Sequence, residues 1–154
     1  MRKLTVSLAT LGLAALGLAM PATAHAGPGC NANWNSHGRD GNVRAWDGYD
    51  CQGRLLGLSP IDDVNWSDPH GHFRGVGNMA SSVMNSGYVG GKDVVAFYWL
   101  VQFQDIAYGC LKPGEKYVDN LSRNRFTNGE NMNNAILSHA WVTASACHPS
   151  SFIS

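Results

Sequence analysis

The chain has little charge and lacks the short motifs that many enzyme classes require. Only 14% of its 154 residues are charged, and 11 basic side chains balance 11 acidic ones. No basic patch stands out, which argues against nucleic acid or an anionic membrane as a partner. There is also no G-x-S-x-G elbow, no P-loop and no dinucleotide-binding fingerprint. The sequence therefore gives no support to the enzyme classes that these motifs mark.

Amphipathic helices are missing as well. No eleven-residue window carries an apolar stripe of 3.6-residue period with capping residues at its ends. Short apolar segments alternate instead with turns rich in Gly, Asn and Asp. This pattern predicts an all-β fold of short strands.

Residues 1–26 have the pattern of a secretory signal peptide. Arg2 and Lys3 precede an apolar stretch over residues 4–20, and Ala24-His25-Ala26 fits a cleavage site. Cleavage there would leave 128 of the 154 residues, with 9 basic and 11 acidic side chains and a net charge of −2. We expect residues 27–154 to form one secreted, extracellular, monomeric domain with no membrane association after cleavage.

Four cysteines, an even number in an exported chain, predict two disulfides. They are Cys30, Cys51, Cys110 and Cys147, and three pairings are possible. The local pairing, first with second and third with fourth, keeps each bridge within its own half. A loop closed in this way would stabilise by roughly 3–4 kcal/mol. A zinc site is the alternative, but it lacks the usual C-x-x-C spacing.

Local patterns predict the course of the chain. Residues 27–41 are expected to be a pinned loop, residues 43–59 a hairpin and residues 60–77 a long surface loop. Residues 94–103 carry no charge and predict one buried strand, which reaches Cys110 through a turn at Gly109. Of the tryptophans, Trp46, Trp99 and Trp141 are expected in the core, whereas Trp34 and Trp66 lie in predicted loops.

Two weak internal matches indicate a repeat. VRAW at Val43 matches VVAF at Val94, an offset of 51 residues, and NMASSVM at Asn78 matches NMNNAIL at Asn131, an offset of 53. Two copies of about fifty residues, 43–90 and 94–147, fit this order. Each copy is too small to bury its own face, so the two are expected to pack as a sandwich.

These residues resemble the microbial βγ-crystallin group. Trp46 followed by Gly53 fits its aromatic hairpin, although Cys51 stands where a second aromatic residue is usual. Residues 78–82 fit its Asn/Asp-Asn/Asp-x-x-Ser/Thr-Ser loop from the second position onward. The resemblance implies two Greek-key units forming two packed antiparallel sheets.

Within that group, the chain is most similar to the metalloproteinase-inhibitor family of streptomycetes. The similarity rests on the export signal, the four cysteines placed two per half, and the segment GCLKPGE. It implies the local disulfide pairing and inhibition of a secreted metalloprotease of thermolysin type. The reactive bond of such inhibitors maps onto Cys110-Leu111, where an apolar residue would enter the protease. The alternative is that Leu111 is a core leucine beside a structural disulfide.

Calcium binding is a second function that the resemblance implies. Asn78, Ser81 and Ser82 are the candidate ligands, since paired oxygen donors suit a hard cation. The first Asn/Asp position of the loop is occupied by Gly77 in the first copy and Glu130 in the second, and Asn134-Ala135 replaces the Ser/Thr-Ser pair. Ser82 is expected to tie down its hairpin by hydrogen bonds. No other cofactor is expected, and a killer-toxin-like antimicrobial protein is a further alternative.

An enzyme is the third possibility, but its support is limited to one loop. Asp68, His70 and His72 lie close together in DPHGH and could form a metal or proton-transfer cluster. The spacing is not that of a zincin motif, and such loops are common. We therefore expect a protein that is not an enzyme.

Overall fold

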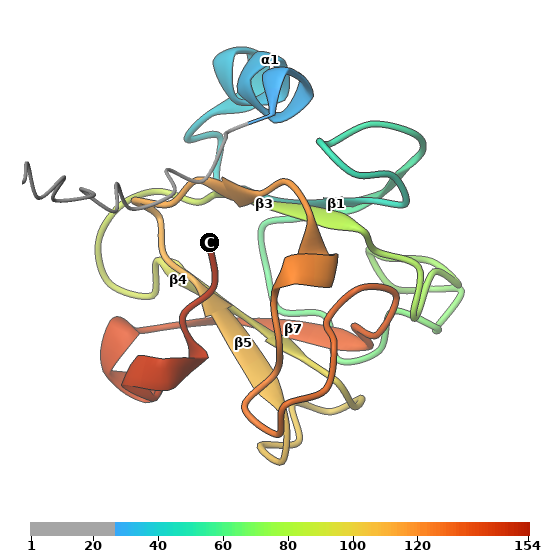
Figure 1. Ribbon diagram of the computed structural model, residues 1–154, viewed down its shortest axis with the longest axis vertical. Coiled ribbons are helices and arrows are strands. Elements are labelled where there is room, and N and C mark those ends of the chain that lie inside the picture. Colours follow the sequence, from blue (N-terminus) through green and yellow to red (C-terminus); the bar gives the residue numbers. More distant parts are fainter. Residues whose placement is uncertain (1–26) are drawn as a thin grey trace, which may run out of the picture.

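The computed structural model describes residues 27–154, and it confirms the all-β prediction. Two antiparallel sheets pack face to face around the main core (Figure 1). No helix within residues 27–154 is long and apolar enough to span a membrane. The elements are α1 (Pro28–His37), β1 (Asn42–Trp46), β2 (Leu55–Ser59), β3 (Ser82–Ser86), β4 (Val94–Tyr98), β5 (Tyr108–Leu111), β6 (Tyr117–Val118), η1 (Leu121–Arg123), β7 (Ser138–Val142), η2 (Ala144–Ala146) and η3 (Pro149–Ser151).

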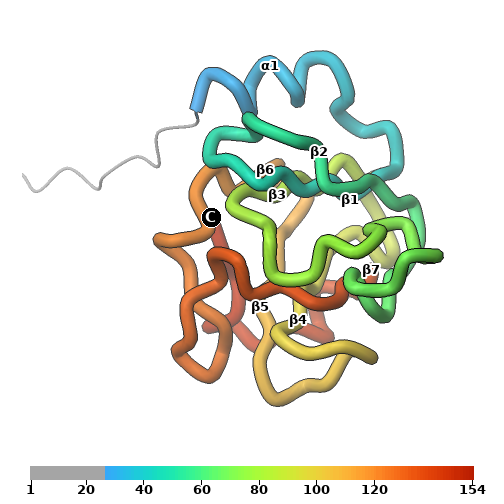
Figure 2. The backbone as a smooth tube through the Cα atoms, turned by 90° about the vertical axis from the view of Figure 1, so that its right-hand side faces the viewer, coloured from blue at the N-terminus to red at the C-terminus, as the bar shows by residue number. Residues whose placement is uncertain are grey.

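The two halves of the chain exchange one segment each. The first sheet has the order β2-β1-β3-β6, so β6 from the second half completes the sheet of the first. The second sheet has the order β5-β4-β7, and Asp63 from the first half pairs with His139 of β7. Figure 2 shows the two sheets as stacked layers. This order gives the two interlocked Greek-key units that the resemblance implied.

Reciprocal hydrogen bonds define how the two halves correspond. Asn78 N–H donates to the Ile136 carbonyl at 3.0 Å, and Asn134 N–H donates to the Ala80 carbonyl at 2.8 Å. Asn78 and Asn134, 56 residues apart, are therefore equivalent, and the predicted offset of 53 is wrong. The counterpart of the Ser81-Ser82 pair is residues 137–138, Leu and Ser, in place of Asn134-Ala135.

Residues 60–77, predicted to be a surface loop, contribute to the core. Trp66 and Phe73 are both 0% exposed, and their rings stack with centroids 4.1 Å apart. The Asp63 carboxylate holds the segment folded, because one of its oxygens accepts from the His72 and Phe73 N–H groups at 3.0 and 2.9 Å. Trp66 is therefore a core residue, although it lies in a segment that was predicted to be a surface loop.

Helix α1 lies where a pinned loop was predicted, and it packs on the outer face of the first sheet (Figure 1). Pro28 suits the first helical turn, whose N–H groups have no partner within a helix. The Asp50 carboxylate accepts from Gly29 N–H at 2.9 Å and from Cys30 N–H at 3.0 Å. A distant side chain thus caps the helix and, with the neighbouring disulfide, fixes its position.

Both disulfides have the local pairing, Cys30 with Cys51 and Cys110 with Cys147. The first joins α1 to the β1–β2 hairpin, and the second joins β5 to the C-terminal segment. That segment covers the outer face of the second sheet, where Phe152 packs against a buried cluster that includes Cys110 and Cys147. Each bridge therefore attaches a cover to one sheet.

The apolar stretch beginning at Val94 is a hairpin and not a single strand. Strand β4 ends at Tyr98, and Gly109 lies within β5, paired with Phe97, in place of the predicted turn. Trp99 is 37% exposed, so its prediction as a core residue is wrong, whereas Trp46 and Trp141 are buried as predicted.

His139 is a buried polar group at the junction of the two halves. Its side chain is 0% exposed; Trp66 Nε1–H donates to its Nδ1 at 2.9 Å, and its Nε2 lies 3.0 Å from the Ile61 carbonyl. These contacts require the neutral ring with the proton on Nε2. Burial lowers the pKa of His139 from 6.5 to about 4, although the Ile61 hydrogen bond and the carboxylates of Asp63 and Asp62 oppose this.

We expect the free energy of unfolding to decrease as the pH falls from about 6.5 to about 4. In that window the unfolded chain binds a proton on His139 that the folded chain does not bind, at a cost of about 3 kcal/mol in total. Below the folded pKa this group causes no further loss. Urea unfolding at several pH values measures the slope, and His139→Gln should reduce it, whereas exposed His70→Gln should not. An NMR titration in which His139 protonates near 6.5 in the folded protein would contradict the prediction.

Candidate functional site

The bond predicted to be reactive, Cys110-Leu111, lies in the interior. Both side chains are 0% exposed, and both residues are paired with β4. The Cys110 carbonyl accepts from Ile153 N–H at 3.0 Å, and the Leu111 carbonyl accepts from the Asn85 amide at 2.9 Å. The folded chain therefore does not present this bond at its surface, and Leu111 packs as a core leucine beside a disulfide.

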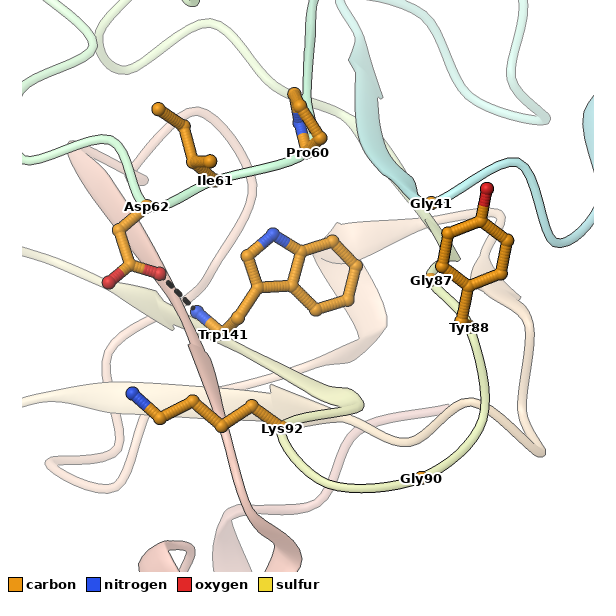
Figure 3. Close-up of a pocket in the computed structure, with 9 residues that line it drawn as sticks. All are labelled: Gly41, Pro60, Ile61, Asp62, Gly87, Tyr88, Gly90, Lys92 and Trp141. Carbon is orange, nitrogen blue, oxygen red and sulfur yellow. Dashed lines mark hydrogen bonds between the residues drawn. The ribbon is translucent and has the colours of Figure 1, made fainter.

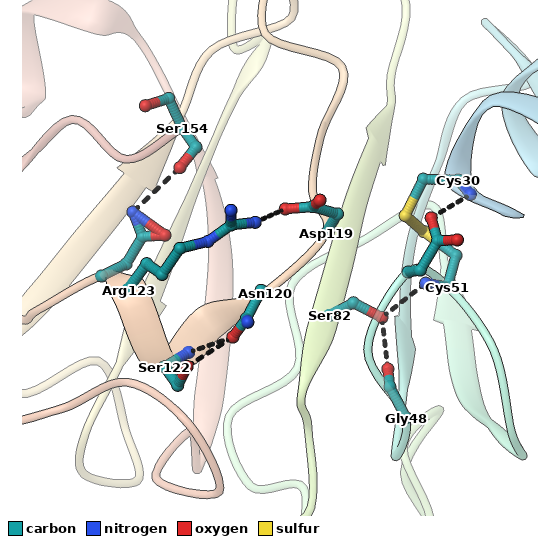
Figure 4. A network of polar contacts seen from close by, with 11 residues as sticks. Cys30, Gly48, Cys51, Ser82, Asp119, Asn120, Ser122, Arg123 and Ser154 are labelled. Atoms are coloured by element: carbon teal, nitrogen blue, oxygen red, sulfur yellow. Dashed lines mark hydrogen bonds and ion pairs between the residues drawn. A yellow bond between two sulfur atoms is a disulfide. The ribbon is translucent and has the colours of Figure 1, made fainter. Parts of the chain in front are cut away.

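Of the candidate calcium ligands, Ser82 is already engaged within its hairpin. Its hydroxyl donates to the Gly48 carbonyl at 2.7 Å and accepts from Cys51 N–H at 3.0 Å, next to the first disulfide (Figure 4). Asn78 is exposed, with a φ of 61°. Ser81 is buried and faces the amide oxygen of Asn134 at 3.5 Å. The structure thus brings Ser81 close to the other half but uses the Ser82 hydroxyl elsewhere.

The DPHGH loop does not gather its side chains into a cluster. Asp68, His70 and His72 are all exposed, and Asp68 accepts from the His70 N–H at 2.8 Å in a local turn. Within residues 27–154, no group of three or more His, Cys, Asp or Glu side chains is placed to hold a metal ion. The short Asp68 contact is therefore explained by turn geometry.

The β4–β5 loop, residues 99–107, lies at the bottom of Figure 1 and carries exposed apolar side chains. Ile106 is 63% exposed and Trp99 is 37% exposed. Val64, which is 51% exposed, lies beside this loop because its carbonyl accepts from Gln102 N–H at 2.8 Å. Exposed apolar side chains gathered in this way are typical of surfaces that bind another protein.

Hydrogen bonds hold the base of this loop. Trp99 N–H donates to the Ala107 carbonyl at 3.0 Å, and the Ser138 hydroxyl of β7 donates to the Leu100 carbonyl at 2.6 Å. Ser138 is the counterpart of Ser82 in the second half. Ser82 of β3 bonds the β1–β2 hairpin, and Ser138 of β7 bonds the β4–β5 hairpin in the same way.

An aromatic contact supports the middle of the loop. The Phe103 ring packs on Tyr98 with centroids 5.7 Å apart, and Gln102 and Phe103 both have left-handed backbone conformations. Burial raises the pKa of Tyr98, and the Asp105 carboxylate raises it further, so this phenol stays neutral over the physiological range. Ile106 follows this supported turn with its side chain in solvent.

The sequence pattern did not indicate this loop, because the uncharged residues 94–103 predict one strand. The polar residues Gln102, Gln104 and Asp105, which interrupt the apolar stretch, were the available signal. Ile106 was indistinguishable from a buried strand residue, since it stands between polar and apolar neighbours.

No protein-family profile matches the chain, and no curated protein matches it. Among solved structures, a βγ-crystallin from Ciona intestinalis is similar, with 14% sequence identity and a TM-score of 0.45. The match covers 66% of this chain and 99% of that chain. The sheet order described above, and not this similarity, identifies the fold. The two disulfides indicate an extracellular or secreted protein.

We expect millimolar calcium to leave the melting temperature of the protein unchanged. The Ser82 hydroxyl is engaged, and the counterpart of Ser81 in the second half is Leu137, which has no side-chain oxygen. An ion that binds only the folded state must raise the melting temperature, so calorimetry with calcium and with chelator tests this. A calcium-dependent rise that disappears in Ser81→Ala would contradict the expectation.

Proposed function

We propose that the protein is a secreted inhibitor of an extracellular metalloprotease of thermolysin type and that the β4–β5 loop enters the protease. The observation that carries this proposal is the 63% exposure of Ile106 in a loop held at its base and middle. Enzymes of this type cut before bulky apolar residues, and Ile106 offers one after Asp105. The resemblance to the streptomycete inhibitor family supports the choice of target.

We assign the inhibitory residue to the β4–β5 loop and not to Cys110-Leu111, because a protease can reach Ile106 but not the buried Leu111. For Leu111 to enter a protease, β5 would have to leave the second sheet and expose a core residue. Ile106 needs no such rearrangement. Both segments belong to the same hairpin, so the Cys110–Cys147 disulfide still anchors the strand that follows the inhibitory residue.

Restricted motion supports tight binding. A loop that is already ordered loses less conformational entropy on docking than a free peptide, which saves about 0.5–1.5 kcal/mol for each side chain held in place. The Trp99–Ala107 and Ser138–Leu100 hydrogen bonds supply this order. If the protease cut before Ile106, pairing of β5 with β4 would keep the new end close to its original position.

Replacing Ile106 with Asp should abolish inhibition of a thermolysin-type protease. A carboxylate placed in an apolar pocket costs several kcal/mol, which corresponds to a loss of affinity of about 100-fold or more. The measurement is titration of the protease with the purified mature chain and its variants. Val89→Asp is the matched control, since Val89 is 70% exposed and precedes β4, whereas the loop follows it.

Three outcomes would reject the proposal. If the wild-type protein does not inhibit the protease, the proposed function is wrong. If the Ile106→Asp and Val89→Asp variants inhibit equally well, the β4–β5 loop is not the segment that enters the protease. Inhibition of microbial growth by a protein without antiprotease activity would favour the killer-toxin-like alternative.

A further inference from the structure

A cavity of about 520 Å³ is lined by residues outside the β4–β5 loop. Its walls come from both halves: Pro60, Ile61 and Asp62 follow β2, Tyr88 and Lys92 lie between β3 and β4, and Trp141 belongs to β7 (Figure 3). The volume falls within the range of small-molecule sites, roughly 300–1,000 Å³. Nothing in the inhibitor proposal uses this cavity.

The Trp141 indole N–H is an unpaired buried donor at this cavity. The side chain is only 8% exposed, and its Nε1 has no hydrogen-bond partner within residues 27–154. In Figure 3 the ring lies among the lining residues, with its nitrogen turned toward Pro60 and Ile61. Buried N–H groups are nearly always paired, and an unpaired one costs about 1–3 kcal/mol. The nitrogen itself is buried from solvent, so an acceptor from outside the chain can reach it only if neighbouring side chains move.

Two charged groups of opposite sign accompany this donor. One oxygen of the Asp62 carboxylate accepts from the Trp141 backbone N–H at 2.7 Å, which leaves the other oxygen available. Lys92 is exposed and forms no ion pair or hydrogen bond with the described part of the chain. Asp62 would repel an anionic ligand, and Lys92 would repel a cationic one. The pair therefore favours a neutral ligand that both donates and accepts hydrogen bonds.

Two aromatic rings line the cavity, and the Tyr88 ring gives it a flat apolar surface. Trp141 packs so closely on Gly87 that a Cβ there would lie 2.4 Å from its Cζ3, and Tyr88 covers Gly41 in the same way, at 2.8 Å. Tyr88 remains 69% exposed, so its ring is available to a ligand. Flat aromatic surfaces beside a few directed polar groups are typical of small-molecule sites.

We infer that this cavity binds a neutral sugar of about disaccharide size. A sugar ring has an apolar C–H face that can pack on the exposed Tyr88 ring. Its hydroxyl groups can accept from Lys92, and they can donate to Asp62. No charge on the ligand is needed.

The test is an NMR titration of the mature protein with cellobiose and, separately, with N,N′-diacetylchitobiose. We expect at least one of them to shift the Trp141 indole N–H signal, which reports directly on the unpaired donor. Tyr88→Ala and Lys92→Ala should each weaken binding about tenfold, since each removes one ligand contact from an exposed side chain. Tyr49→Ala is the matched control, because Tyr49 is 49% exposed on the β1–β2 hairpin, and it should bind as wild type does.

The inference fails if neither disaccharide moves the Trp141 signal, or if both cavity variants bind like wild type. A shift caused by the neutral peptide acetyl-Ala-Leu-amide but by neither sugar would assign the cavity to peptides and also overturn it. Unchanged spectral dispersion in each variant establishes that the fold is intact. Loss of protease inhibition in Ile106→Asp has no bearing on these outcomes.

Discussion

The exchange of one segment between the two halves is the constraint on which the rest of the structure depends. β6 completes the first sheet beside β3, and Asp63 pairs with His139 at the edge of the second. His139 reinforces the exchange because its ring bonds Trp66 and Ile61, both from the other half. Neither sheet is complete without both halves, so the two share one core. The cavity is lined from both halves, and the β4–β5 loop of the second half bonds Val64 of the first.

The disulfides act outside this core. One attaches α1 to the first sheet, and the other attaches the C-terminal segment to the second. Each cover buries a sheet face that would otherwise meet solvent, which explains why β1, β3, β4 and β5 are buried along nearly their whole length. It also explains why Leu111 is not accessible, since its strand is covered on both faces.

Local patterns were sufficient for the fold class and the first hairpin, because turns are encoded over short distances. The disulfide pairing followed from the family resemblance, since the cysteine count alone left three pairings open. Local patterns failed where a distant group decides the structure. The carboxylate that caps α1 belongs to Asp50, some 20 residues beyond the helix start, and Trp66 is buried because it meets His139. The predicted repeat alignment was wrong because the local sequence around Asn131 resembles that around Asn78. The backbone hydrogen bonds show that the structural equivalent of Asn78 is Asn134.

The candidate site was less predictable than the fold for a related reason. An apolar residue beside a cysteine has the same sequence pattern whether it faces the core or solvent, so Leu111 could not be placed. Ile106 and Trp141 gain their character from surroundings assembled from both halves. Trp141, for example, meets Asp62 from a segment 79 residues earlier.

The exchange also has a consequence for the order of folding. Contacts of His139 and Trp141 with residues 61–66 span 73 to 79 residues. Until β6 and β7 have been made, β3 is paired only with β1, and the Trp66 ring lacks its partner His139. A chain that must close such long loops before it gains stability folds slowly, on a scale of milliseconds to seconds. The first half alone would expose the unpaired edge of β3 for that interval.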